Sequence, residues 1–87
     1  MGYILAVFAV RTETMQFYNM LKRAGVNAMI VETPKTLQAS CGISVKFMQT
    51  DLSMAKNILN ISKMRSFVRF YLVSGNFGRR TISPILL

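Results

Sequence analysis

The amino-acid sequence predicts an α+β fold, a two-layer sandwich in which an antiparallel sheet carries two helices on one face, in the order β-α-β-β-α-β. The chain has 87 residues, a length that holds one domain with one hydrophobic core. Hydrophobic residues make up 52% of it, too large a share for a disordered chain. Short β-branched and aromatic runs alternate with two stretches of helical periodicity, and this alternation predicts the element order.

The first half of the chain has the pattern of a strand, a helix and a second strand. Residues 3–10 are apolar throughout, which is typical of a central strand buried on both faces. Residues 13–24 have helical periodicity, with Thr12 as the expected N-cap. Residues 27–33 form the second strand, which ends before Pro34. The buried stripe of the helix is expected to contain Phe17, Met20, Leu21 and Ala24.

The second half repeats the order strand, helix and strand after an irregular loop at residues 35–42. Residues 43–48 alternate between apolar and polar side chains and predict a half-buried strand. A helix capped by Thr50 or Asp51 follows, and residues 67–73 form the last strand. The apolar face of this helix would contain Leu52, Ala55, Ile58 and Leu59. The last strand would place Val68, Phe70 and Leu72 on one face and Phe67, Arg69, Tyr71 and Val73 on the other.

This element order is the split β-α-β arrangement of ferredoxin-like domains. We expect residues 1–74 to form the ferredoxin-like domain and residues 75–87 to form a basic C-terminal tail with an apolar end. The first crossover makes the first two strands parallel, and the third strand returns antiparallel between them. Three loops therefore meet at one end of the sheet: residues 11–12, 35–42 and 63–66.

Cys41 lies in the second of these loops and is the single cysteine of the chain. Cations and a helix N-terminus favour the thiolate form of a nearby cysteine. Gly42 permits close backbone approach or a positive φ beside the thiol. The sequence therefore predicts a reactive thiolate in an anion-attracting pocket, with Cys41 as the reacting group. The expected thiolate- and anion-stabilising residues are Lys35, Gly42, Arg11, Thr12, Lys63 and Arg65.

A structural role for Cys41 is the alternative interpretation. Free cysteine is often a small buried hydrophobe with no reactivity. The neighbours Ser40 and Gly42 place it in a loop rather than in an apolar run. From the residues alone, both interpretations of this cysteine stay open.

The composition excludes several classes of function. One cysteine cannot form an internal disulfide, and without histidine it cannot complete a Cys/His zinc site. The absence of histidine also excludes the commonest hydrolase triads, so we expect no cofactor, no metal and no acid/base enzyme. The longest apolar run, residues 3–10, is under half of the ~20 residues that cross a membrane. An unpaired cysteine without an export signal indicates the cytoplasm.

Residues 3–73 resemble the DUF3343 family of selenium/sulfur (Se/S) carrier protein-like domains. The resemblance rests on residues 21–25, on Pro34-Lys35, and above all on the Ala39-Ser40-Cys41-Gly42 loop before residues 43–47. It implies that residues 1–74 are a carrier-like domain in which Cys41 holds sulfur or selenium as a persulfide or selenopersulfide. Such a carrier would exchange the atom with donor and acceptor proteins. The chain departs from the family pattern at Val10-Arg11, where a Ser-Thr pair is usual, and at Tyr18, where an acidic residue is usual.

Two other functions remain alternatives to a carrier. The net charge of +8 and the pI near 10.4 are typical of nucleic-acid-binding proteins. Phe67, Arg69, Tyr71 and Lys46 could then form a binding face on the sheet, although the aromatic signature of RNA-recognition motifs is absent. Alternatively, the sheet face without helices could join two copies in a homodimer or bind another protein.

Overall fold

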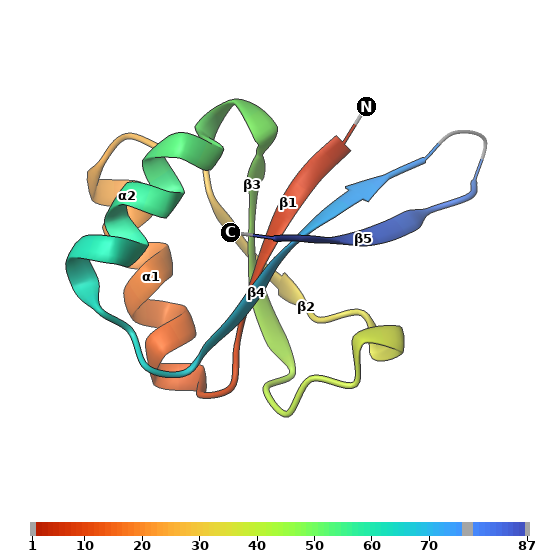
Figure 1. Cartoon of the computed structure of the whole chain (residues 1–87), viewed down its shortest axis with the longest axis horizontal. Helices are drawn as coiled ribbons and strands as arrows, with labels where there is room; N and C mark the ends of the chain where they lie inside the picture. The colour runs from red at the N-terminus through yellow and green to blue at the C-terminus, as the bar shows by residue number, and fades with distance from the viewer. Residues whose placement is uncertain (1, 76–77, 87) are drawn as a thin grey trace.

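The computed structural model describes residues 2–75 and 78–86 (Figure 1). Two helices cover one face of a five-stranded sheet, so the α+β class and the two-layer architecture are confirmed. Within the described residues, no helix is long and apolar enough to span a membrane. The elements are β1 (Gly2–Phe8), α1 (Arg11–Arg23), β2 (Met29–Glu32), η1 (Lys35–Leu37), β3 (Ile43–Met48), η2 (Gln49–Asp51), α2 (Leu52–Ser62), β4 (Phe67–Ser74) and β5 (Thr81–Ile85).

The sheet has the order β2-β3-β1-β4-β5, and all neighbouring strands are antiparallel. β3 lies between β1 and β2, as the topology predicts. β1 is central and apolar, and its residues 4–8 are all buried. The first four strands and both helices thus follow the predicted order, and β5 extends it to β-α-β-β-α-β-β, which differs from the strict ferredoxin-like arrangement.

β5 corrects the expectation that the segment after β4 is a tail outside the sheet. Ile82 pairs with Val73, and Pro84 pairs with Tyr71. Proline lacks the N–H that a central strand needs, but an edge strand tolerates it because one side of that strand has no partner. β5 is such an edge strand, so Pro84 does not interrupt the sheet. Of the expected tail, residues 76, 77 and 87 lie outside the described residues, Leu87 of its apolar end among them.

The main core lies between the sheet and the helices. Its largest buried side chains include Phe8, Phe17, Phe47 and Phe70. The rings of Phe47 and Phe70 pack edge to face, with their centroids 6.0 Å apart. α1 contributes Phe17 and Leu21 as predicted, and α2 contributes Ala55 and Leu59. Within the predicted stripe of α1, Met20 is half-buried, and Ala24 is exposed beyond the last turn of the helix.

A β-bulge in β4 corrects the predicted faces of this strand. Val7 pairs with Arg69 and Phe8 pairs with Phe67, so the register skips Val68. Phe67 therefore does not share a face with Arg69. It packs against the main core, with its ring centroid 4.9 Å from that of Phe70. Val68 is the unpaired residue and is exposed, because a bulge interrupts the alternation of faces.

The start of α1 differs from the prediction, whereas α2 begins after one of the two predicted cap residues. Val10, not Thr12, is the N-cap of α1, and its side chain forms no capping hydrogen bond. Asp51 is the N-cap of α2, one of the two predicted positions, but its side chain forms no capping hydrogen bond. The 3-10 turn η2 directly precedes this helix. Sequence identifies residues that favour caps, but the chain direction at the end of the preceding strand decides whether the side chain reaches the helix.

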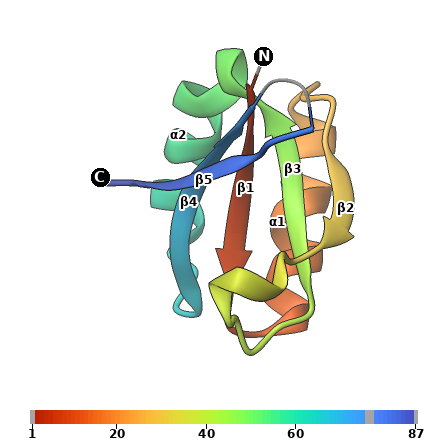
Figure 2. The same cartoon turned by 90° about the vertical axis from the view of Figure 1, so that its right-hand side faces the viewer.

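The sheet face opposite the helices, which faces the viewer in Figure 2, is called the open sheet face. It has a second apolar cluster. Leu5, Val7 and Val73 are buried at its centre. The loop that contains η1 packs on the cluster through Leu37 and Ala39. Strand register places these side chains on the open sheet face: Tyr3, Leu5, Val7, Val31, Lys46, Arg69, Tyr71, Val73 and Ile82.

Candidate functional site

Cys41 lies directly before β3, at the end of the sheet where α1 begins. Successive side chains of a strand alternate between the two sheet faces, so Cys41 lies on the same face as Ile43 and Val45. This is the helix-facing side of the sheet. The residue is only 6% exposed. The side chain is therefore largely buried, and it lies beneath the first turn of α1, where it contacts Thr14.

Thr14 is the side chain that contacts this sulfur. Its hydroxyl oxygen lies 3.7 Å from Sγ of Cys41 and 3.1 Å from the carbonyl oxygen of Val10. A threonine hydroxyl has one hydrogen to donate. When it donates to Val10, the thiol donates to Thr14; when the sulfur is a thiolate, the hydroxyl can rotate and donate to it. Thr14 is fully buried, so this exchange takes place without water.

Hydrogen bonds join the three loops at this end of the sheet. The Ser40 hydroxyl donates to the carbonyl of Ala9 at 3.2 Å, and the Ala9 N–H donates to the carbonyl of Ser66 at 2.7 Å. The loop after β1 thus connects to the β2–β3 loop on one side and to the α2–β4 loop on the other. The predicted meeting of these loops is confirmed.

Glu13 holds the α2–β4 loop against α1. Its carboxylate accepts hydrogen bonds from the Ser66 N–H at 2.8 Å and from the Ser66 hydroxyl at 2.7 Å. These bonds favour the charged form of Glu13 and so hold its pKa below the ordinary value. The bond from the Ser66 N–H has the largest effect. The carboxylate therefore stays ionised and keeps the loop in place.

A hollow of about 320 Å³ opens beside Cys41, and Lys35 and Gly42 line it with the cysteine. Glu32 is also in the lining, so the hollow contains a carboxylate as well as an ammonium group. At Gly42, an added Cβ would meet no heavy atom within 4 Å, and φ lies outside the left-handed region. Gly42 therefore uses neither the close approach nor the positive φ that glycine permits. The remaining lining residues are Thr33, Pro34, Gln38 and Ala39.

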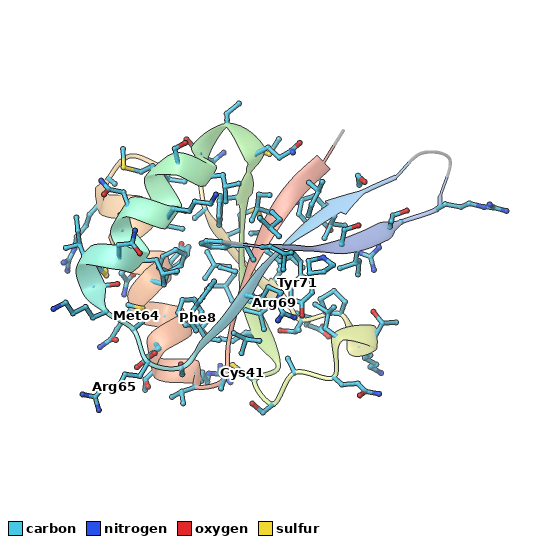
Figure 3. The ribbon with its side chains drawn as sticks, in the orientation of Figure 1. Phe8, Cys41, Met64, Arg65, Arg69 and Tyr71 are labelled. Carbon is cyan, nitrogen blue, oxygen red and sulfur yellow. The ribbon has the colours of Figure 1, made fainter. Side chains whose placement is uncertain are left out.

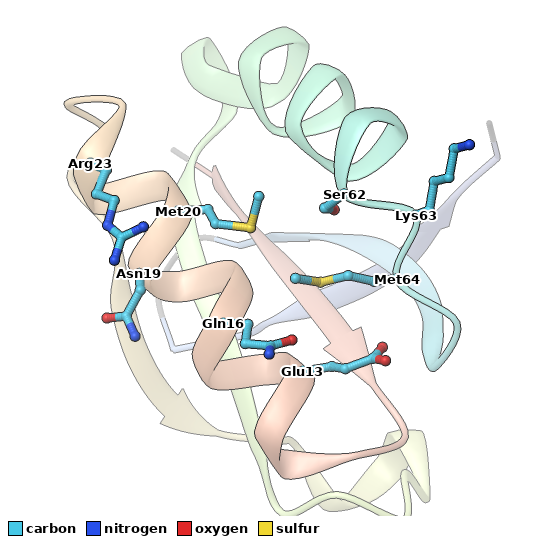
Figure 4. A pocket seen from close by; sticks show the side chains of 8 residues that line it. All are labelled: Glu13, Gln16, Asn19, Met20, Arg23, Ser62, Lys63 and Met64. Atoms are coloured by element: carbon cyan, nitrogen blue, oxygen red, sulfur yellow. The ribbon is translucent and has the colours of Figure 1, made fainter.

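The other predicted stabilising residues lie elsewhere at this end of the molecule. Arg11 and Thr12 are exposed in the first turn of α1. Lys63 lines a separate groove of about 450 Å³ between α1 and α2, together with Glu13 and Met64 (Figure 4). Arg65 lies apart from Cys41 in Figure 3. Among the described hydrogen bonds, none links these four residues to the sulfur.

Sequence reasoning missed Thr14 and Ser40. A signal for Thr14 was present, because it lies three residues before Phe17 and seven before Leu21, on the same stripe of α1. A polar residue on a buried helix stripe needs a partner, and here the partners are Val10 and Cys41. Ser40 had no comparable signal, because its bond to Ala9 depends on how two distant loops meet.

Comparisons with known proteins were made against families, curated proteins and solved structures. The family model described as "Putative Se/S carrier protein-like" matches residues 3–65. The matched segment runs from β1 to the α2–β4 loop and contains Cys41 and Thr14. Comparison with curated proteins and with solved structures gave no match.

Proposed function

The chain belongs to the Se/S carrier protein-like family, and from this premise we propose that Cys41 carries sulfur or selenium between proteins as a persulfide or selenopersulfide. One observation supports the proposal more than any other. The single cysteine of the chain lies where three hydrogen-bonded loops meet, beneath the N-terminus of α1 and beside a hollow lined by Lys35.

Loading is an exchange between a thiolate and a persulfide. The Cys41 thiolate attacks the outer sulfur of a donor protein's persulfide, so a bond forms between Sγ and that sulfur while the donor's S–S bond breaks. The donor cysteine leaves as a thiolate, and the transferred atom keeps its proton. Delivery repeats the exchange, with an acceptor thiolate attacking the outer atom on Cys41. Charge and electrons balance in both steps, so no oxidant or reductant is consumed.

Three groups near Cys41 could interact with the sulfur anion that forms in this exchange. The positive end of the helix dipole of α1 lies at its first turn, where Thr14 contacts the sulfur. The Thr14 hydroxyl can donate a hydrogen bond to the thiolate. Lys35 lines the hollow beside Cys41, together with Glu32. A carrier needs no general acid or base beyond these groups, because the leaving group is itself a stabilised thiolate.

Burial of Cys41 makes transfer depend on opening of the β2–β3 loop. The hydrogen bonds between this loop, residues 33–42, and the rest of the molecule lie at its two ends. Thr33 shares a hydroxyl bond of 2.6 Å with Ser44, Ser40 donates to the carbonyl of Ala9, and Cys41 contacts Thr14. The Thr33 N–H also donates to the carbonyl of Gly42 across the loop. Gln38 has a left-handed backbone conformation with φ of 51°, at the end of η1. Displacement of the loop would widen the hollow and expose Sγ to a docked donor, while the sheet beneath remains paired.

The test is to incubate the reduced protein with a persulfide-loaded donor protein and measure intact mass. We expect Cys41 to gain the mass of one sulfur atom, and Cys41→Ser to gain none. Lys35→Ala should slow loading, whereas Lys22→Ala, which removes the same charge in the last turn of α1, should not. A wild-type protein that gains no sulfur or selenium, or a Cys41→Ser variant that gains as much, would refute the carrier function.

A further inference from the structure

The open sheet face brings two tyrosines together on neighbouring central strands. Tyr3 of β1 pairs with Val73 of β4, and Leu5 pairs with Tyr71. Directly opposed residues share a face, so the two tyrosines are diagonal neighbours, at a spacing of about 7–8 Å for such pairs. Both are half-buried, with Leu5 and Val73 forming the buried floor between them. Two neighbouring aromatic rings therefore lie on the central strands of the open sheet face.

Two cations contact Tyr3, and a third lies near Tyr71 on the same strand face. Nζ of Lys46 lies 4.4 Å from the ring centroid of Tyr3, and Nη1 of Arg80 donates to the Tyr3 hydroxyl at 3.5 Å. Arg69 is exposed, two residues from Tyr71 on the same face of β4. In Figure 3, Arg69 and Tyr71 lie on the side of the sheet that carries η1, away from Phe8 and the helices.

The acidic residues of the chain lie away from this surface. There are three of them, and Glu13 is bound to Ser66 beside α1. Asp51 precedes α2 on the helix layer. Glu32 of β2 pairs with Ile43 and so points to the helix-facing side of the sheet. The open sheet face therefore has cations and aromatic rings with no carboxylate among its strand positions.

From this combination we infer that the open sheet face binds single-stranded nucleic acid, independently of Cys41. Tyrosine rings stack on bases with little dependence on the nucleotide sequence, and lysine and arginine side chains attract the phosphates. Tyr71 is the stronger stacking position, because Lys46 already covers one face of Tyr3. Lys46, Arg69 and Arg80 would contact the phosphates. An acidic polypeptide would satisfy the cations but would make no use of two neighbouring rings.

Fluorescence anisotropy with labelled oligouridylate and oligothymidylate tests the inference on the full chain. We expect both to bind, more weakly as salt rises. Tyr71→Ala should weaken binding by roughly 5- to 150-fold, the range for loss of one base–aromatic stack. Tyr71→Phe keeps the ring and should bind as the wild type does, as should Cys41→Ser.

Charge variants separate a specific surface from general attraction. Arg69→Ala should lower the slope of log affinity against log salt by about 0.7, the value for one phosphate contact on a single strand. Arg23→Ala removes the same charge from the last turn of α1, on the helix layer, and should leave the slope unchanged. Equal effects of the two variants, or equal competition by polyglutamate, would overturn the inference.

Intrinsic fluorescence provides a readout that leaves every residue of the open sheet face unchanged. The chain has three tyrosines and no tryptophan, so Tyr18→Phe leaves only Tyr3 and Tyr71 as emitters. Stacked bases quench tyrosine, so oligouridylate should quench this variant along the same curve as the anisotropy. Binding without quenching, or no binding at low salt, would also overturn the inference.

Discussion

Replacing Thr14 by valine tests whether the first turn of α1 controls the reactivity of Cys41. Valine keeps the shape of threonine and removes the hydroxyl. The carbonyl of Val10 still accepts the backbone N–H of residue 14, which lies 3.1 Å away, so it keeps a partner. The variant loses about 0.5–1.5 kcal/mol from one hydrogen bond and gains about 0.8 kcal/mol from one more buried methyl group. Its stability should therefore stay within about 1 kcal/mol of the wild type.

The thiolate should respond far more strongly than the fold. Thr14 is fully buried and its hydroxyl lies 3.7 Å from the sulfur, so the variant leaves the anion without this donor. A hydrogen bond to a charged group is worth about 1.5–3 kcal/mol, and the length of this contact favours the lower end. A loss of about 1.4 kcal/mol is tenfold in an equilibrium constant. We expect alkylation of Cys41 near neutral pH to be about tenfold slower in Thr14→Val.

The assay is the rate of alkylation by iodoacetamide across a range of pH, followed by intact mass. At high pH every molecule is a thiolate, so the plateau rate measures access to the sulfur. The two proteins should share this plateau, and Thr14→Val should react more slowly than wild type near neutral pH. Thr14→Ser keeps the hydroxyl and should follow the wild type. Superimposable curves for Thr14→Val and wild type would refute the role of this contact.

Two further predictions concern stability. The lowered pKa of Glu13 means that its hydrogen bonds to Ser66 stabilise the fold above the ordinary pKa of 4.5, and that this stabilisation is lost as the pH falls through the lower, folded-state pKa. In thermal unfolding, acid should lower the stability of Glu13→Gln less than that of wild type. Equal losses of stability would contradict the stabilising role of the Glu13–Ser66 hydrogen bonds. Phe70→Ala should cost about 3–5 kcal/mol in urea unfolding because Phe70 is fully buried among other aromatic rings. Val68→Ala, at the exposed bulge, should change stability by less than about 0.5 kcal/mol. Similar losses of stability for Phe70→Ala and Val68→Ala would rule out the observed pairing of β4 with β1.

Much of the fold follows from patterns within single segments. The alternation over Ile43–Met48 predicted β3 at its observed bounds, and the spacing of Phe17 and Leu21 predicted the buried stripe of α1. Such patterns are readable because the side-chain period of a strand or helix is a property of the backbone itself. The bulge at Val68 was not readable, since it depends on how β4 pairs with β1.

The candidate site divides in the same way. The residue types alone identified Cys41 as the one available thiol, and the element order alone predicted which loops surround it. Only the tertiary structure decided that Thr14 contacts the sulfur, that Lys35 shares its hollow while Lys63 lines another groove, and that β5 completes the open sheet face. The physical reason is that a local pattern determines the face on which a side chain lies, whereas its neighbours across that face come from segments distant in the chain.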